Sequence, residues 1–220
     1  MATFDAARKN MVDCQIQTMG VVMPELLAAY ERIPRERFVP AGLQHIACAD
    51  RDLPLGGGRY LLDSSTHARL LQAAEPRPTD HVLDIGGCTG YSAAILSGLV
   101  EKVIALEENR EFLEQGQSLW RGLGLTNIIP RKGTLAAGDP EYAPYDLIIV
   151  NGAMHSIPPA LAAQLAPRGR MLAILKQGEN DIGHACRVSS AGQGQFSTYT
   201  LFEAGAPFLP GLSPPAAFVF

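Results

Sequence analysis

The chain has few cysteines, and no two of them lie close together in the sequence. The four cysteines among 220 residues stand at positions 14, 48, 88 and 186. This spacing excludes a Cys-x-x-Cys redox pair and the paired ligands of a zinc knuckle, so we expect no metal. Unpaired thiols are typical of a reducing compartment, and we expect a cytoplasmic protein.

The chain also lacks an excess of positive charge and a long apolar run. It carries 18 Lys and Arg against 22 Asp and Glu, a net charge of −4, which gives no indication of a basic face for nucleic acid. No segment is long and apolar enough to suggest a membrane span, and residues 1–10 lack the apolar core of a signal peptide. We therefore expect neither nucleic acid nor a membrane as partner. Hydrophobic residues make up 47% of the chain, enough for a substantial core.

Residues 1–78 show no regular alternation of strands and helices. Apolar residues at positions 4, 7, 11 and 14 recur at helical spacing, and a second helical pattern follows Pro24. Prolines at positions 34, 40 and 54 and glycines at 56–58 indicate turns and a flexible link. A further helix is expected from His67 to Ala74. We interpret 1–78 as a helical cover and substrate-side segment, and 79–220 as an α/β domain.

From residue 80 to about 176 the pattern alternates between strand and helix. Strands are expected at 81–85, 102–106, 127–131, 146–150 and 170–175, and helices at 92–99, 109–121 and 158–165. This alternation predicts a mostly parallel sheet with helices on both faces. Residues 196–202 alternate in polarity and predict a C-terminal edge strand, and the apolar ending 217–220 is expected to be shielded from water.

Residues 81–91 are the most informative segment. A short apolar strand carries Asp84 near its end, the turn Gly86–Gly90 follows, and a helical segment begins at Tyr91. Such a turn lets the backbone approach a ligand, and the helix start offers free N–H groups. Glu107 ends the next expected strand, about 20 residues on, where a carboxylate can bind a ribose diol.

Two common nucleotide-binding patterns are missing from this turn. The dinucleotide fingerprint G-x-G-x-x-G is not supplied, and no P-loop Gly-Lys-Ser/Thr is present. The pattern Asp-x-Gly-x-x-x-Gly resembles instead the first motif of S-adenosylmethionine-dependent methyltransferases, in which the strand-end acid orients water or the methionyl ammonium. A strand-turn-helix corner without any ligand is the alternative.

Further segments resemble the protein-L-isoaspartate O-methyltransferase family over nearly the whole chain. Residues 33–40 (Ile-Pro-Arg-Glu-Arg-Phe-Val-Pro) and 47–56 (Ala-Cys-Ala-Asp-Arg-Asp-Leu-Pro-Leu-Gly) are similar to N-terminal motifs of that family. Residues 143–151, 157–170 and 207–212 resemble its fourth strand, the following helix and turn, and its C-terminal Phe-x-Pro-Leu. The resemblance implies a Rossmann-like methyltransferase fold, S-adenosyl-L-methionine as cofactor, and transfer of its methyl group to an isoaspartyl carboxylate in damaged protein.

The chain departs from this family at three positions. Without gaps, Leu62 stands where the family has the serine of Thr-Ile-Ser-x-Pro, Cys88 stands at a central glycine, and Thr134 follows Gly133 where the family has an acid on the adenine amine. A side chain at Cys88 would crowd the ligand unless the turn shifts to use Gly87. The positions expected to contact the cofactor are Asp84, Gly86, Gly87, Cys88, Gly90, Glu107, Thr134 and Asn151.

The substitution at Leu62 leaves the acceptor open. A carboxylate is already ionised at neutral pH and needs no general base, so transfer depends on positioning and desolvation. Asp63, Ser64 and Ser65 are the candidate catalytic residues, and Asp63 is equally suited to cap a helix. If the acceptor is an alcohol or amine, a base is needed, and Asp63 and His67 are the nearest. The alternatives are a methyltransferase with another acceptor and a non-catalytic donor-binding protein.

Overall fold

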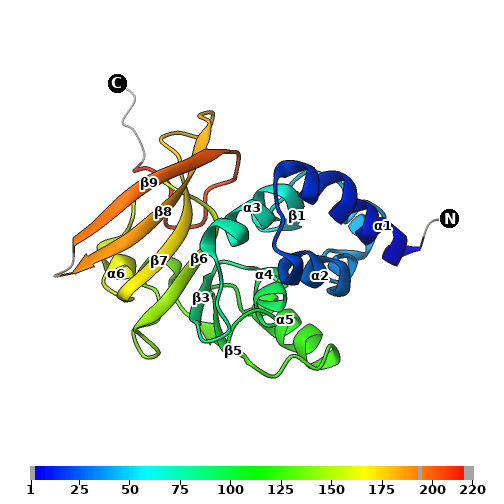
Figure 1. Ribbon diagram of the computed structural model, residues 1–220, viewed down its shortest axis with the longest axis horizontal. Coiled ribbons are helices and arrows are strands. Elements are labelled where there is room, and N and C mark those ends of the chain that lie inside the picture. The colour runs from blue at the N-terminus through cyan, green and yellow to red at the C-terminus, as the bar shows by residue number, and fades with distance from the viewer. Residues whose placement is uncertain (1–2, 193–194, 216–220) are drawn as a thin grey trace.

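Five adjacent parallel strands make up most of one sheet in the computed structural model, which describes residues 3–192 and 195–215. Their order is β5 (Ile128–Lys132), β4 (Lys102–Glu107), β3 (His81–Ile85), β6 (Tyr145–Met154) and β7 (Leu165–Leu175). The antiparallel strands β8 (Gly183–Gly192) and β9 (Gln195–Ala204) extend the β7 edge. The predicted α/β fold with a mostly parallel sheet and C-terminal edge strands is confirmed (Figure 1).

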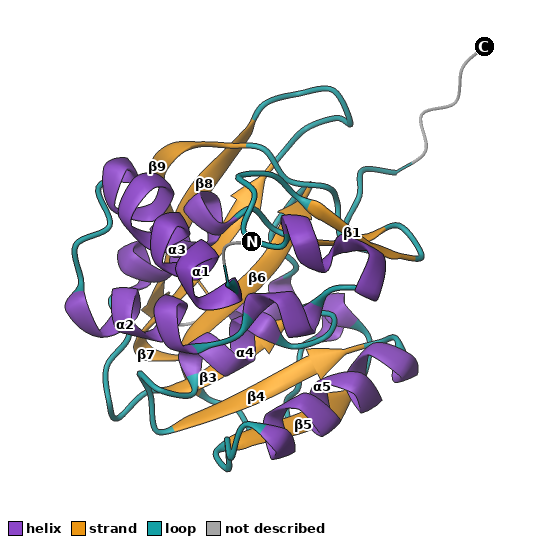
Figure 2. Ribbon diagram, turned by 90° about the vertical axis from the view of Figure 1, so that its right-hand side faces the viewer, coloured by secondary structure: helices purple, strands orange, loops and turns teal. Residues whose placement is uncertain are grey.

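The two faces of the sheet carry different covers. Side chains of alternate residues point to opposite faces, so Val82 packs among the N-terminal helices while Leu83 and Ile85 pack in a second cluster. The first face is covered by α3 (Ser64–Ala74), α4 (Tyr91–Leu96) and α5 (Arg110–Gly122), with α1 (Phe4–Met11) and α2 (Pro24–Arg32) beyond them (Figure 2). The second face is covered by the short α6 (Pro159–Ala162), the 3-10 turn Leu135–Ala137 and the segment 207–212.

Several element boundaries differ from the sequence expectation. The helix expected from His67 begins at Ser64, because the Asp63 side chain accepts a hydrogen bond from Thr66 N at 2.7 Å and caps it. The helix expected at 158–165 is only α6, and β7 already begins at Leu165 rather than at residue 170. The N-terminal helical pattern is interrupted after Met11 by a π turn, Val12–Ile16, and a 3-10 turn, Gln17–Met19. Residues 217–220 lie outside the described part of the chain.

A buried arginine holds distant parts of the N-terminal segment together. After the 3-10 turns Arg35–Phe38 and Ala41–Ile46, the hairpin of β1 (Leu53–Gly56) and β2 (Arg59–Leu61) leads into α3. Arg35 is fully buried, and its guanidinium donates to Ala47 O at 2.8 Å and to Leu62 O at 2.6 Å. The division at residue 78 stays a prediction, although α3, on its N-terminal side, contacts β7 and β6.

A second buried arginine joins several elements at the amino ends of the parallel strands. Arg170 on β7 pairs with Asp80 at 2.7 Å, and both side chains are almost fully buried. The same guanidinium donates to backbone oxygens of Ala74, Glu75 and Asp146, at the end of α3 and the start of β6. Asp80 also accepts from Arg77 N, so this cluster joins α3, β3, β6 and β7.

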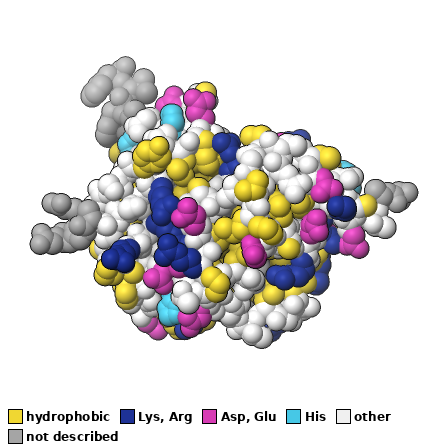
Figure 3. Space-filling view, viewed as in Figure 1, with side chains coloured by type: hydrophobic (Ala, Val, Ile, Leu, Met, Phe, Trp, Pro, Cys, Tyr) yellow, Lys and Arg dark blue, Asp and Glu magenta, His cyan; other side chains and the backbone are white. Residues whose placement is uncertain are grey.

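The described residues contain no helix long and apolar enough to cross a membrane. Charged side chains of both signs are scattered over the face of the molecule seen in Figure 3, and neither sign dominates there. Among the described residues, no cluster of three His, Cys, Asp or Glu is arranged to hold a metal ion.

Replacing Arg170 by Ala should destabilise the fold strongly, because Asp80 is left buried without its cation. We expect the free energy of unfolding, measured by urea denaturation at pH 7, to fall by about 3–5 kcal/mol. The double variant Asp80→Asn with Arg170→Ala should recover part of that loss. Arg110→Ala, which breaks an exposed pair with Glu114, serves as the control and should leave the midpoint unchanged. An Arg170→Ala midpoint equal to that of the control would contradict this account.

Candidate functional site

The candidate site lies at the carboxyl ends of two parallel strands, beside a third strand that continues past them. β3 ends at Ile85, β4 ends at Glu107, and β6 presents Asn151 beside them. In open α/β sheets ligands collect outside the carboxyl ends of such strands. The side chains of Asp84 and Asn151 meet here, because Asn151 Nδ2 donates to Asp84 Oδ1 at 2.8 Å and to Ile85 O at 3.0 Å.

The turn between β3 and α4 takes three left-handed residues. Gly86, Cys88 and Gly90 have φ of +68°, +52° and +83°. Gly87 is not among them, so the turn does not shift to use that glycine in place of Cys88. A non-glycine residue in this region is strained, by about 1–3 kcal/mol. Gly90 must be glycine for a second reason, since an added Cβ would lie 2.1 Å from the Trp120 ring.

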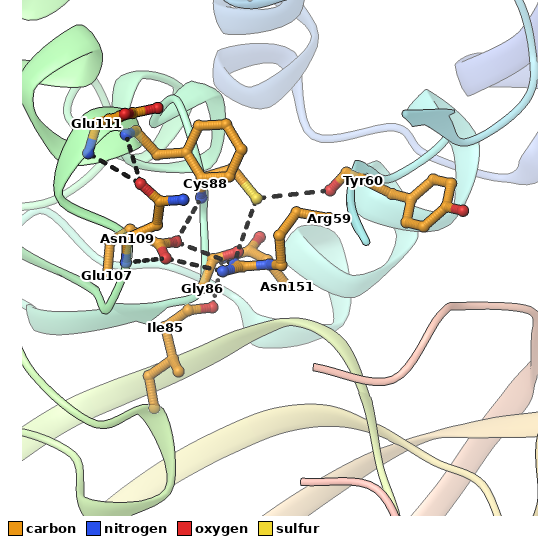
Figure 4. Close-up of polar contacts among 10 residues, drawn as sticks. Arg59, Tyr60, Ile85, Gly86, Cys88, Glu107, Asn109, Glu111 and Asn151 are labelled. Atoms are coloured by element: carbon orange, nitrogen blue, oxygen red, sulfur yellow. Dashed lines mark hydrogen bonds and ion pairs between the residues drawn. The ribbon is translucent and has the colours of Figure 1, made fainter. Parts of the chain in front are cut away.

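The Cys88 thiol is a packing group held against the β1–β2 hairpin. Its Sγ lies 3.6 Å from Gly86 O and 3.8 Å from Tyr60 O (Figure 4). Burial raises the pKa of this thiol to about 12, so it stays protonated at neutral pH. These features are those of a buried packing residue and not of a reactive thiol.

Asp84 is a buried carboxylate that is only partly satisfied. One oxygen, Oδ1, accepts from Ser92 Oγ at 2.6 Å as well as from Asn151. The other, Oδ2, has no hydrogen-bond partner among the described residues. Burial raises the pKa of Asp84 to about 6, against the lowering effect of its hydrogen bonds. An unpaired carboxylate oxygen beside a glycine turn is suited to a cationic or hydrogen-bond-donating ligand.

Glu107, in contrast, has its full set of partners. Arg59 on β2 reaches across the turn, with Nη1 2.7 Å from Oε1 and Nη2 2.9 Å from Oε2. Cys88 N donates to Oε2 and Asn109 N to Oε1, each at 3.0 Å. Arg59 and Glu107 are both at least 95% buried. Figure 4 shows the guanidinium lying between the glycine turn and the end of β4.

Leu209 and Arg59 together cover the glycine turn. A Cβ added at Gly86 would lie 2.9 Å from Leu209 Cδ1 and 3.2 Å from Arg59 Nη2. Leu209 is held there by the C-terminal segment, which bonds to β6 through Ala153 N to Pro207 O and Leu209 N to Ala153 O. The space around the turn is thus divided into small cavities of about 240, 200 and 190 Å³.

One of these cavities is lined by Leu62, the position at which the family resemblance places a serine. Leu62 and His67 line the cavity of about 240 Å³ together with Gly87, Ser92 and other residues. His67 is 3% exposed, its Nδ1 lies 2.6 Å from the Tyr30 hydroxyl, and its Nε2 has no partner among the described residues. Burial lowers the pKa of His67 to about 3, so the ring is neutral at neutral pH.

The three candidate catalytic residues lie around the start of α3. Asp63 caps that helix, Ser64 Oγ donates to Gln15 Oε1 at 3.2 Å, and Ser65 Oγ donates to Asp50 Oδ1 at 2.8 Å. None of the three lines a cavity at the glycine turn. Thr134 is exposed after β5, directly before the 3-10 turn at Leu135. Roles for these four residues stay predictions.

An open cleft of about 910 Å³ lies beside the small cavities. Four carboxylates and two cations line it, together with residues 205–207: Asp50, Asp52, Asp63, Glu179, Arg51 and Lys176. Burial raises the pKa of Asp52, whose carboxylate accepts from Asp63 N at 2.9 Å. Pro207 borders both this cleft and the cavity of about 200 Å³ that contains Arg59 and Leu209.

Sequence reasoning found the two acids and the turn but missed the residues that cover them. Arg59, Trp120 and Leu209 carry no pattern that places them at the turn. Arg59 had the most visible signal, since it directly follows three glycines and precedes the altered segment at Leu62. The long side chain of an arginine beside a glycine-rich tip can point into the protein or out to solvent, and the sequence does not distinguish these two orientations.

Comparisons with known proteins agree on the family. A family model described as protein-L-isoaspartate(D-aspartate) O-methyltransferase matches residues 6–202. A protein-L-isoaspartate O-methyltransferase of Trichlorobacter lovleyi is 34% identical over 210 residues, covering 96% of this chain and 95% of that protein. A protein-L-isoaspartate O-methyltransferase of Methylorubrum extorquens is 39% identical over 166 residues, covering 76% of this chain and 72% of that protein.

Solved structures with the same fold cover nearly the whole chain. A protein-L-isoaspartate O-methyltransferase structure aligns with a TM-score of 0.81 and 24% identity, covering 94% of this chain and 67% of that one. A Plasmodium falciparum structure, titled as a complex with S-adenosyl-L-homocysteine, aligns with a TM-score of 0.76 and 14% identity, covering 94% and 98%. With the family model matching most of its length and curated relatives above 30% identity, this chain belongs to the protein-L-isoaspartate O-methyltransferase family of S-adenosylmethionine-dependent methyltransferases.

Proposed function

We propose that this protein transfers a methyl group from S-adenosylmethionine to a carboxylate on a protein or peptide. The observation that carries the proposal is the pair of acids, Asp84 and Glu107, at the ends of adjacent parallel strands on either side of a glycine turn. Membership of the family supports the reaction class, and the names of the relatives support an isoaspartyl acceptor.

The residues fit the donor at one end of the site and not at the other. At Asp84, a buried carboxylate oxygen without a partner suits the cationic amino-acid end of the donor. At Glu107, both oxygens are already occupied by four N–H groups of this chain, so a ribose diol has no acceptor. When bound, the donor supplies an electrophilic methyl group on a sulfonium. The protein orients the donor and the acceptor and excludes water from the site.

The acceptor side is built from Leu62, His67 and the start of α3. An ionised carboxylate needs no general base, so a neutral His67 does not argue against transfer. We assign His67 Nε2 as the polar atom available to orient the acceptor, because it is buried beside Leu62 without a partner among the described residues. Asp63, which lines the open cleft, and Ser64 and Ser65, which follow it at the start of α3, are assigned to the acceptor side.

The charge of the open cleft favours a second candidate function. Four carboxylates against two cations would repel an approaching carboxylate and attract a cation. A methyltransferase on the same scaffold with a cationic nitrogen acceptor fits this lining. Such an acceptor must lose a proton, and Asp52, whose pKa burial raises, lies beside Asp63 in that cleft.

Methyl transfer to peptides separates these candidates. With labelled S-adenosylmethionine, we expect transfer to a peptide that contains one isoaspartyl residue and none to the same peptide with ordinary aspartate. Transfer to a lysine-rich or arginine-rich peptide alone would instead support the second candidate. No label in any peptide, together with no binding of S-adenosylhomocysteine at millimolar concentration, would refute both.

Leu62→Ser should raise the isoaspartyl activity. A hydroxyl at this position restores a hydrogen-bond donor for the acceptor carboxylate, and a bond to a charged group contributes about 1.5–3 kcal/mol, or roughly tenfold or more in kcat/KM. Leu62→Ala is the matched control, because it removes the same buried side chain without adding a donor. Equal kcat/KM values for the two variants would contradict the role assigned to position 62.

Donor affinity should depend on pH through Asp84. Its pKa is raised to about 6 by burial, so the ionised form that attracts the donor ammonium is present above pH 6 and is lost below it. We expect S-adenosylhomocysteine to bind about tenfold more weakly at pH 5 than at pH 7. Titration calorimetry across this range measures the change, and Asp84→Asn should bind weakly at every pH. A wild-type affinity that does not change between pH 5 and pH 7 would disprove the assignment.

A further inference from the structure

The inference concerns Arg59, a buried cation in the place where the family's cofactor is expected. Its guanidinium contacts both oxygens of Glu107 and the backbone oxygen of Gly86. These atoms belong to the strand end and the glycine turn, the two parts of the fold that the sequence assigns to donor binding. Arg59 therefore occupies part of the region that is expected to bind the donor.

The contacts leave Glu107 with no free acceptor. An ionised carboxylate has about four lone-pair sites, and each oxygen of Glu107 already accepts from one Arg59 nitrogen and one backbone N–H. Two hydroxyl groups of a ribose can bind this carboxylate only if the guanidinium leaves. When Arg59 leaves, Cys88 N and Asn109 N still donate to it, so Glu107 is not left without partners.

The space around the turn also indicates that the donor cannot bind while Arg59 is in this position. Ligand pockets for molecules of this size are about 300–1,000 Å³. Even with the narrow spaces between atoms counted, the three cavities at this turn are each below that range, and Leu209 and Arg59 lie against Gly86. Arg59 lines the cavity of about 200 Å³ with Tyr60 and Leu62, whereas Glu107 lines the cavity of about 190 Å³. The guanidinium that binds Glu107 thus occupies space that a ligand of both regions would need.

The β1–β2 hairpin has a glycine tip that would allow Arg59 to move outward. Arg59 directly follows Gly56, Gly57 and Gly58, which all have positive φ and have no atom within 4 Å of an added Cβ. This glycine tip is exposed to solvent. Arg59 Nε is also buried without a partner among the described residues, so the inward position does not satisfy the whole side chain.

We propose that Arg59 is an internal competitor of the methyl donor: it occupies the ribose position on Glu107, and the donor binds only after the β1–β2 hairpin withdraws it. This proposal rests on the proposed function, because it takes S-adenosylmethionine as the ligand of the site. It makes Arg59 the residue that sets donor affinity. The closed state lowers the apparent affinity by the fraction of molecules that are open.

Binding of S-adenosylhomocysteine to the full chain tests the proposal. We expect Arg59→Gln to bind at least about tenfold more tightly than the wild type. Adding Glu107→Gln to Arg59→Gln should remove the gain, because the ribose then lacks its carboxylate. Arg77→Gln is the matched control, since it removes one positive charge from an exposed position before β3 and should bind as the wild type does.

The rate of binding gives an independent readout. The single tryptophan, Trp120, donates to Gly90 O at 2.9 Å, so its fluorescence reports on the turn. If the hairpin must open first, the observed binding rate of the wild type levels off at high ligand concentration. The rate for Arg59→Gln should keep rising over the same range.

The outcomes distinguish this inference from the proposed function. Equal and tight binding by the wild type and Arg59→Gln overturns the competitor role and leaves the methyltransferase function standing. Absence of binding by both at millimolar ligand overturns both. If Arg59→Gln does not give a cooperative thermal transition, Arg59→Lys takes its place. A lysine ammonium lacks the planar two-nitrogen fork that matches the Glu107 carboxylate, so affinity should still rise, and an unchanged affinity would refute the proposal.

Discussion

The ion pair between Arg59 and Glu107 is the interaction on which the architecture of the site depends. It joins a short hairpin from the N-terminal third of the chain to the end of a central strand of the sheet. Burying both charges carries a desolvation cost that only complete hydrogen bonding offsets. The backbone N–H groups of Cys88 and Asn109 complete the hydrogen bonding of the Glu107 carboxylate. The same carboxylate therefore holds both the turn and the start of α5.

The two acids of the site are therefore in opposite states. Asp84 keeps an oxygen without a partner and has a pKa raised by burial, which are features of a site that awaits a ligand. Glu107 is saturated by its own chain. The strand-end acids and the glycine turn face the β1–β2 hairpin, which supplies the Arg59 cation and a backbone contact from Tyr60 to the Cys88 thiol. The three departures expected from the sequence, Leu62, Cys88 and Thr134, lie after this hairpin, in the glycine turn and after β5.

Much of the fold could be predicted from the sequence because it is encoded locally. The apolar run at 146–150, the Asp84 turn and the acid at Glu107 each depend on neighbours in sequence, and strand pairing then places them together. The short α6 and the early start of β7 were missed, because helix and strand preferences overlap across 158–170. Arg59 and Leu209 could not be placed, since their positions are set by partners 48 and more than 100 residues away in the chain. The buried Arg35 belongs to a motif that was recognised, but its role in fixing Leu62 O became visible only in the structure.

The covering of the glycine turn by Leu209 has a consequence for proteolysis. This residue approaches Gly86 and Gly152 so closely that neither glycine could carry a Cβ without a shift of the leucine, and it is held there by backbone bonds between Ala153 and the residues Pro207 and Leu209. A segment more than 100 residues away in the sequence thus forms part of the wall around the turn. Cleavage that released 207–212 would therefore expose the turn to solvent without removing either acid of the site.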